Sequence, residues 1–289
     1  MSQTTPTPTT GTHRLRRITL TVRPTETFPV PISDGYSVYS ALLAALNDVD
    51  AAVSEHIHDS PLGSLHSSGL LGVFGNSNRD YHKTVRSDRS YELSLGIVDS
   101  RDDDIFQSLV SALVLDGNEL ELTNGTLHVE IFESENTSHE ALLAQASEYD
   151  NPSIEMEFRT PTCIEEAGDV TTMFPHRRAV FQSLCGKWNR TAPDEHELAI
   201  DDEDVLAHII EKPDARAYDT HSVLVNRIRT EDDESRAIFR QGFTGRCEYA
   251  LKDASESVQN AVVALALFGE YSGVGSAVAR GCGNVQVNL

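Results

Sequence analysis

The sequence predicts an α/β protein of the α+β type, built from tandem ferredoxin-like (RRM-like) domains, each an antiparallel sheet covered by helices. A succession of strand, helix, strand, strand, helix and strand patterns occurs twice along the 289 residues, and this is the order of the ferredoxin-like motif. A polar stretch at 147–153, with Asn151 and Pro152, separates the two patterns and is typical of a domain junction. We therefore expect domains at 14–148 and 152–289.

In the first half, alternating polar and apolar residues predict strands at 15–22 and 90–98. Two more strands are expected at 119–122 and 126–132, around an Asn-Gly turn. Apolar residues at helical spacing predict a helix over 102–114 and a single earlier helix, capped by Ser33 or Asp34, that ends within 55–61. Residues 61–89 contain four glycines and are expected to form a loop with short extended pieces.

In the second half, the same patterns predict strands at 154–159, 222–228, 236–249 and 285–287. Helices are expected at 177–188, 201–210 and 258–268. The last helix follows Asp253-Ala-Ser-Glu256, which has the spacing of a capping box.

The chain is strongly acidic, and nearly all of its basic residues are arginines. Lys plus Arg total 23 against 45 Asp plus Glu, a formal net charge of −22. A carboxylate-rich, lysine-poor surface predicts a halophilic protein that works in concentrated salt, because the Debye length falls to about 3 Å at molar ionic strength. An ordinary acidic protein that avoids nucleic acid is the alternative, since this charge opposes long-range attraction of RNA.

The expected cellular location rests on the lack of a secretion signal, a membrane-spanning run and a paired cysteine motif in the sequence. Residues 1–13 are rich in Thr and Pro, lack the segments of a secretion signal and are expected to form a disordered leader. No apolar run approaches the roughly 20 residues of a membrane span. The cysteines are widely spaced and form no Cys-x-x-Cys pair, at Cys163, Cys185, Cys247 and Cys282. We expect a cytoplasmic protein.

The most specific motif is two Gly-x-Gly pairs five residues apart, formed by Gly273, Gly275, Gly281 and Gly283, with Arg280 beside the second pair. Glycines let backbone amides approach a phosphodiester, which predicts a site for a polyanionic backbone. The order here is helix, loop, strand, whereas nucleotide-binding loops join a strand to a helix. The alternative is a loop whose glycines serve only tight packing of the helix against the strand.

Residues 268–275 and 280–285, Phe-Gly-Glu-Tyr-Ser-Gly-Val-Gly and Arg-Gly-Cys-Gly-Asn-Val, resemble the glycine-rich signature of the RAMP superfamily of CRISPR-associated proteins. Residues 157–162, 174–175, 180–188 and 242–249 are similar in order and spacing to the C-terminal half of the CRISPR repeat-processing endoribonucleases, the Cas6 family. The resemblance implies metal-independent cleavage of precursor CRISPR RNA within each repeat. The implied reaction is attack of a ribose 2′-hydroxyl on its own 3′-phosphate, which leaves a 2′,3′-cyclic phosphate and a 5′-hydroxyl.

The resemblance also implies a histidine near the end of the first helix as general base or acid. Residues 57–59, Ile-His-Asp, are similar to the family's Leu-His-Asp, so His58 is the first candidate, and histidine titrates in the range that this chemistry needs. His56 and His66 compete; His56 and His58 would point about 200° apart on one helix. No lysine lies between His58 and Lys83, so supporting roles fall to nearby groups, namely Tyr36, Tyr39, Ser67, Ser68 and Lys83.

Basic residues beside aromatic ones predict further RNA contacts. They are Lys187, Arg190, Arg240 and Arg246, with an amphipathic protein surface as the alternative. Short-range arginine contacts survive salt better than long-range attraction does. The histidines are scattered, so no metal or cofactor is expected. Expected partners are CRISPR repeat RNA, its crRNA product and subunits of a Cascade-type interference complex; the alternative function is a non-catalytic RAMP subunit that binds crRNA.

Overall fold

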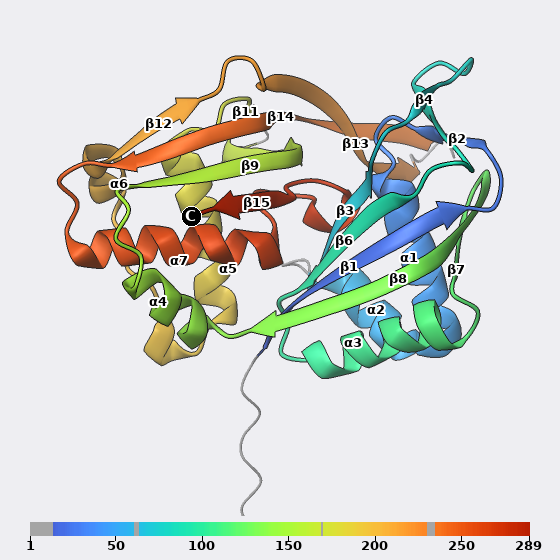
Figure 1. Ribbon diagram of the computed structural model, residues 1–289, viewed down its shortest axis with the longest axis horizontal. Helices are drawn as coiled ribbons and strands as arrows, with labels where there is room; N and C mark the ends of the chain where they lie inside the picture. The colour runs from blue at the N-terminus through green and yellow to red at the C-terminus, as the bar shows by residue number, and fades with distance from the viewer. Residues whose placement is uncertain (1–13, 61–63, 169, 230–234) are drawn as a thin grey trace, which may run out of the picture.

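The computed structural model describes residues 14–60, 64–168, 170–229 and 235–289, so the predicted leader at 1–13 lies outside the described residues. Two sheets lie side by side, and each has its own set of helices (Figure 1). The first sheet and its helices come from the first half of the chain, and the second sheet comes from the second half.

The N-terminal sheet has the strand order β3-β6-β1-β8-β7, with every neighbouring pair antiparallel. Its strands are β1 (Leu15–Pro24), β3 (Leu65–Leu71), β6 (Tyr91–Ile97), β7 (Glu119–Leu122) and β8 (Gly125–Thr137). The first strand lies between the third and fourth of the motif, β6 and β8, because helices carry the chain across the sheet. This is the predicted ferredoxin-like arrangement.

Helices α1 (Gly35–Val49) and α3 (Asp102–Val110) pack on one face of this sheet. Ile18 and Leu20 alternate inward from β1 and are fully buried with Leu42 and Leu46 of α1 and Leu109 of α3. Full burial of a side chain of this size contributes about 1.5–3 kcal/mol to the stability of the folded state. The apolar stripe that predicted these helices therefore forms the N-terminal core.

The single helix expected before residue 61 is in fact two helices, α1 and α2 (Ala51–Asp59). Asp50 between them has extended backbone, with φ −149° and ψ 95°. Its carboxylate accepts hydrogen bonds from the amides of Ala52 and Val53 at 3.0 and 3.2 Å. An aspartate that caps a new helix in this way ends the previous one. The break allows α2 to take its own direction.

Residues 65–71, within the stretch expected to form a loop with short extended pieces, form the full strand β3, and six of its seven residues are buried. The register of β3 against β6 shifts between Ser67 and Leu70, and Gly69 has φ +67°. Such a bulge breaks the two-residue alternation by which a strand is recognised in a sequence. Small polar side chains fit here because the C-terminal part of the chain covers this strand.

The C-terminal sheet has the order β12-β14-β9-β15, and β13 also pairs with β14. Its strands are β9 (Ser153–Thr162), β12 (Ile209–Pro213), β13 (Asp219–Arg229), β14 (Ser235–Leu251) and β15 (Val285–Asn288). Residues 247–251 of the 17-residue β14 pair with β12, and residues 235–244 pair with β13. The two shorter strands together take the place of one ferredoxin strand.

Helices α5 (Arg177–Thr191) and α7 (Glu256–Ser272) pack on this second sheet. Trp188 and Phe268 form an edge-to-face pair with ring centroids 5.3 Å apart, and both are fully buried. The N-cap of α7 is Ser255, whose hydroxyl accepts from the amide of Val258 at 3.3 Å. The expected cap at Asp253 is therefore wrong by two residues.

A further helix, α4 (His139–Ser147), was not predicted from the sequence. The hydroxyl of Ser138 caps it by accepting from the amide of Ala141 at 3.1 Å. Leu142 and Ala146 belong to the C-terminal core, and Figure 1 shows α4 beside α7. α4 thus precedes the predicted junction in the chain but packs with the second half, and the domain limits 14–148 and 152–289 remain a prediction.

Smaller elements complete the fold. A three-stranded sheet has the order β2-β5-β4 and a two-stranded sheet consists of β10 and β11. α3 continues into a π-helical turn at Ser111–Leu115. The bounds of the others are β2 (Phe28–Pro31), β4 (Gly75–Asn76), β5 (His82–Val85), β10 (Ile164–Ala167), β11 (Val170–Thr172), α6 (Asp202–His208) and the 3-10 turns η2 (Asp194–His196) and η3 (Val278–Arg280).

Candidate active-site cleft

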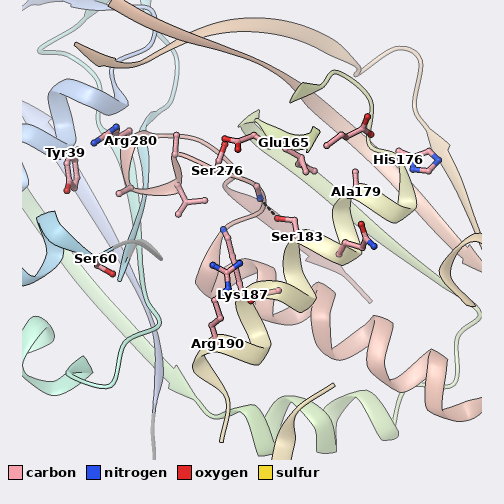
Figure 2. A pocket seen from close by; sticks show the side chains of 18 of the residues that line it. Tyr39, Ser60, Glu165, His176, Ala179, Ser183, Lys187, Arg190, Ser276 and Arg280 are labelled. Carbon is pink, nitrogen blue, oxygen red and sulfur yellow. Dashed lines mark hydrogen bonds between the residues drawn. The ribbon is translucent and has the colours of Figure 1, made fainter. Parts of the chain in front are cut away.

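A cleft of about 900 Å³ lies between the two halves of the molecule. The N-terminal side contributes Tyr39 of α1, His58 in the last turn of α2, and Ser60. The C-terminal side contributes one face of α5, part of β10 and the glycine-rich loop at 275–280. Figure 2 shows Lys187 and Arg190 on α5, with Tyr39 and Ser60 on the other side of the cleft. Hydroxyl groups and a histidine of the N-terminal side therefore face cationic side chains of the C-terminal side.

His58 and His56 point into different surroundings. His58 is exposed and lines the cleft. His56 does not line it, and its Nε2 atom lies 3.0 and 3.1 Å from the two carboxylate oxygens of Asp99. The ring of His56 is thus engaged by an acid, whereas that of His58 is open to a ligand in the cleft.

His66 and Ser67 lie inside the protein rather than in the cleft. Both have 0% exposed surface in β3. Burial, together with the positive charge of Lys187, lowers the pKa of His66 to about 3, so this imidazole is neutral at physiological pH. The hydroxyl of Ser67 accepts from the amide of Gly69 at 3.3 Å. Neither residue can touch an RNA in this arrangement, which argues against their candidate roles.

Tyr39 is the supporting candidate that reaches the cleft. Its side chain is 6% exposed, and burial raises the pKa of its hydroxyl, so that Tyr39 is a neutral donor. The guanidinium carbon of Arg280 lies 5.8 Å from its ring centroid. Lys83, in contrast, is paired with Asp34 at 3.1 Å and lies over the ring of Phe74, outside the residues that line the cleft.

Helix α5 presents a polar stripe to the cleft. Its members are three or four residues apart, which places them on one face of the helix, and they are Gln182, Ser183, Gly186, Lys187 and Arg190. Gln182 and Ser183 were not among the expected site residues, although this spacing was visible in the sequence. The stripe begins near the glycine-rich loop and ends with the guanidinium of Arg190.

Lys187 holds the end of α7. Its Nζ atom donates to the carbonyl oxygens of Ser272 and Gly273 at 3.2 and 2.8 Å. Burial, and then the charge of Arg190, lower the pKa of Lys187 to about 7. Arg190 itself donates from Nε to the carbonyl of Gly186 at 2.8 Å, and Arg280 donates from Nη1 to the carbonyl of Val225 at 3.0 Å. Both guanidinium groups keep further donors for a phosphate.

The amides of the glycine-rich loop are used within the protein. Those of Gly273, Gly275 and Gly283 donate to the carbonyl of Gly269, the hydroxyl of Ser183 and the carbonyl of Pro161, at 2.9, 3.0 and 3.1 Å. An amide that already donates in this way cannot also bind a phosphate. These three amides therefore already have acceptors within the protein, and the expected role of the four glycines in RNA binding stays a prediction.

The same glycines allow very close packing, as the alternative interpretation proposed. A Cβ atom on Gly281 would lie 2.6 Å from the Cα of Gly35 at the start of α1, and one on Gly283 would lie 2.0 Å from the carbonyl oxygen of Val274. Both residues also have positive φ, at +86° and +74°. The loop joins the two domains through backbone contact with α1, and it forms one wall of the cleft.

Arg240 and Arg246 lie outside the cleft, and their expected role in RNA binding stays a prediction. Arg240 forms an ion pair with Glu165 and donates to the hydroxyl of Ser276 at 2.7 Å, so it supports the cleft wall from behind. Arg246 is paired with Asp214 at 3.3 Å, and neither arginine is among the residues that line the cleft. Their partners, 75 and 32 positions away in the chain, could not be read from local sequence.

Two properties of the described residues concern metals and membranes. Within them, no three His, Cys, Asp or Glu side chains are grouped so that they could hold a metal ion. No helix in the same part of the chain combines the length and apolar character needed to cross a membrane.

Fold and cleft together define a protein of two ferredoxin-like domains, with a histidine on one side of the cleft between them and arginines on the other. Residues 156–285 match the family model described as CRISPR-associated endoribonuclease Cas6. The CRISPR-associated endoribonuclease Cas6 of Streptococcus thermophilus is 28% identical over 195 residues, which span 66% of this chain and 72% of that protein.

Solved Cas6 structures have the same fold over almost the whole chain. The structure of Thermus thermophilus Cas6 superposes with a TM-score of 0.67 at 16% identity and covers 97% of this chain and 100% of its own. A Cas6-related protein from Pyrococcus furiosus gives a TM-score of 0.62 at 13% identity, covering 95% of this chain and 98% of its own. These likenesses show that the chain has the fold of the solved Cas6 proteins.

Proposed function

We propose that this protein is a metal-independent endoribonuclease that cuts precursor CRISPR RNA within its repeats to produce crRNA. The observation that carries the proposal is the exposed His58 at the edge of a cleft whose opposite wall holds Arg190. A group that transfers protons and a cation that binds phosphate are the two requirements for cleavage of RNA by its own 2′-hydroxyl. The similarity to Cas6 endoribonucleases supports the same activity.

In the proposed reaction, the 2′-oxygen forms a bond to phosphorus as the bond from phosphorus to the 5′-oxygen breaks. The 2′-hydroxyl loses a proton to a base, and the departing 5′-oxygen gains one, so the products are a 2′,3′-cyclic phosphate and a 5′-hydroxyl. We assign a proton transfer to His58. Tyr39, as a neutral donor, would hydrogen-bond a phosphate oxygen, and Arg280 and Arg190 would offset the negative charge that develops there.

The net charge of −22 requires that short-range contacts hold the RNA. We propose that the protein works in concentrated salt, where carboxylate repulsion is screened and direct hydrogen bonds from arginine remain. The partners proposed on this basis are CRISPR repeat RNA and, after the cut, a Cascade-type interference complex that receives the crRNA.

A substrate that lacks one 2′-hydroxyl tests whether this group is the nucleophile. Purified protein in molar KCl with EDTA is expected to cut a labelled repeat RNA, and a substrate with a single 2′-deoxy nucleotide before the cut is expected to remain intact, because it lacks the nucleophile. Mass spectrometry of the upstream product should find the cyclic phosphate. Cleavage of the deoxy substrate would refute the mechanism, and tight repeat binding without any cleavage would identify a non-catalytic crRNA-binding subunit instead.

Arg190 offers a test of RNA binding in the same cleft. Arg190→Ala is expected to raise the Kd for repeat RNA about 10–100-fold, since a hydrogen bond to a charged group contributes about 1.5–3 kcal/mol. Arg246→Ala is the matched control, because Arg246 lies outside the cleft and is paired with Asp214. Its Kd should stay within about twofold of wild type. The Kd values are measured by filter binding in the same salt. An equal rise in Kd in both variants would contradict the assigned binding site.

A further inference from the structure

The carboxylate of Asp99 binds the chain on both sides of His58. His56, two residues before His58, places Nε2 at 3.0 and 3.1 Å from the two oxygens of Asp99. Ser64, six residues after His58, donates its hydroxyl to Oδ2 of the same carboxylate. One side chain, two residues after β6, thus contacts a residue before and a residue after the candidate catalytic histidine in the chain.

Few other side-chain hydrogen bonds are made by the described residues 56–60. Ile57 is 3% exposed and packs in the N-terminal core, and the amide of Ser64 donates to the hydroxyl of Ser60 at 3.3 Å. α2 has only nine residues, and His58 lies in its exposed last turn. The end of a short helix frays readily unless tertiary contacts hold it.

Asp99 is itself held in a fixed orientation. Its Oδ1 accepts from the amide of Arg101 at 2.8 Å, and its side chain is 12% exposed. Burial alone would raise the pKa of Asp99, but the hydrogen bonds from Ser64, Arg101 and His56 bring that pKa below its usual value. The group is therefore an anion near neutral pH, and charge-assisted hydrogen bonds to an anion are stronger than neutral ones.

We propose that Asp99 is a positioning residue, which sets the location of His58 in the cleft through its contacts with His56 and Ser64. The proposal rests on the proposed function. Asp99 does not line the cleft, and it borders a smaller adjoining cavity of about 270 Å³. Its influence on catalysis is therefore through the segment and not through contact with RNA. His56, an expected catalytic candidate, becomes part of this support.

The test compares Asp99→Ala with a control of the same chemistry elsewhere. Asp214 also accepts from the amide two residues on, at 3.0 Å, and from a cationic side chain, Arg246. Asp99→Ala is expected to lower the single-turnover cleavage rate about 10–100-fold, since displacement of a catalytic group by about 1 Å has an effect of this size. Its Kd for RNA should stay within about threefold of wild type, because the cleft arginines remain. Asp214→Ala should change neither quantity.

A conservative variant separates positioning from general stability. Asp99→Asn keeps an acceptor for the Arg101 amide and gains an N–H that can donate to Ser64, so it should recover most of the rate lost in Asp99→Ala. Ser64→Ala removes one of the two contacts with Asp99, so its cleavage rate should fall less than that of Asp99→Ala. An unchanged cleavage rate in folded Asp99→Ala would overturn the proposal.

Hydrogen exchange gives a readout that does not depend on activity. Without RNA, amides at 56–60 should exchange faster in Asp99→Ala than in wild type and Asp214→Ala, because the last turn of α2 opens more often. Unchanged protection there would also overturn the proposal. Absence of cleavage by wild-type protein, in contrast, would refute the proposed function and leave the exchange result to decide the role of Asp99.

Discussion

Replacement of His58 by alanine is expected to lower the rate of RNA cleavage by about 10²–10⁴-fold, the contribution typical of one positioned general acid or base. The side chain is exposed on the wall of the cleft. Its removal should leave the fold intact, since no core contact is lost, and the cations that bind RNA are unchanged. The expected signature is therefore a slow enzyme that still binds repeat RNA with wild-type Kd.

The measurement is single-turnover cleavage of end-labelled repeat RNA, with binding measured on the uncleavable 2′-deoxy substrate. His56→Ala is the control, because its ring contacts Asp99 and lies outside the cleft. The cleavage rate of His56→Ala should fall by less than about tenfold, because His58 is displaced but its proton transfer is not lost. The assignment would fail if His56→Ala abolished cleavage while His58→Ala retained it.

The second large effect concerns stability. Gly283→Ala is expected to lower the free energy of unfolding by about 2–5 kcal/mol, the sum of overpacking at about 1–3 kcal/mol and a left-handed backbone at about 1–2 kcal/mol. The added Cβ would lie 2.0 Å from the carbonyl oxygen of Val274, and φ is +74°. Because backbone atoms on both sides are fixed by neighbouring hydrogen bonds, the clash cannot be relieved by a change of rotamer.

Gly168→Ala separates the two contributions. Gly168 also has a left-handed backbone, with φ +58°, but a Cβ there would meet no described atom within 4 Å. The free energy of unfolding lost in Gly168→Ala should reflect backbone strain without a clash, at about 1–2 kcal/mol. Both variants are compared by urea denaturation at one salt concentration. Equal destabilisation in the two proteins would show that the contact between Gly283 and Val274 contributes nothing.

The hydrophobic periodicity of the sequence predicted most of the regular strands and helices. Strands such as 15–22 and 285–287 and the helix over 177–188 were expected from local patterns, and the ferredoxin-like topology followed from their order. It failed where a bulge interrupts the pattern, as in β3. It also failed where one residue, Asp50, gains more as the cap of a new helix than as part of the old one.

The candidate site could be anticipated only in part, for a physical reason. Resemblance pointed to His58, which does face the cleft. The direction of a backbone amide, however, depends on partners such as Pro161 and Ser183, which are about a hundred residues away from the glycine-rich loop. The same holds for His56, whose partner Asp99 is 43 positions away. Composition gives the chemistry of a side chain, but only the fold gives its partner.

The contact between Gly35 and Gly281 fixes how closely the two halves of the molecule approach each other. A Cβ atom on either glycine would lie within 2.6 Å of the other residue's Cα atom, so no side chain fits between the two segments. The approach of the glycine-rich loop to the start of α1 is therefore set by the main chain. Under the proposed function, we expect the distance from the cleft arginines to His58, and with it the position of the cut, to depend on this main-chain contact.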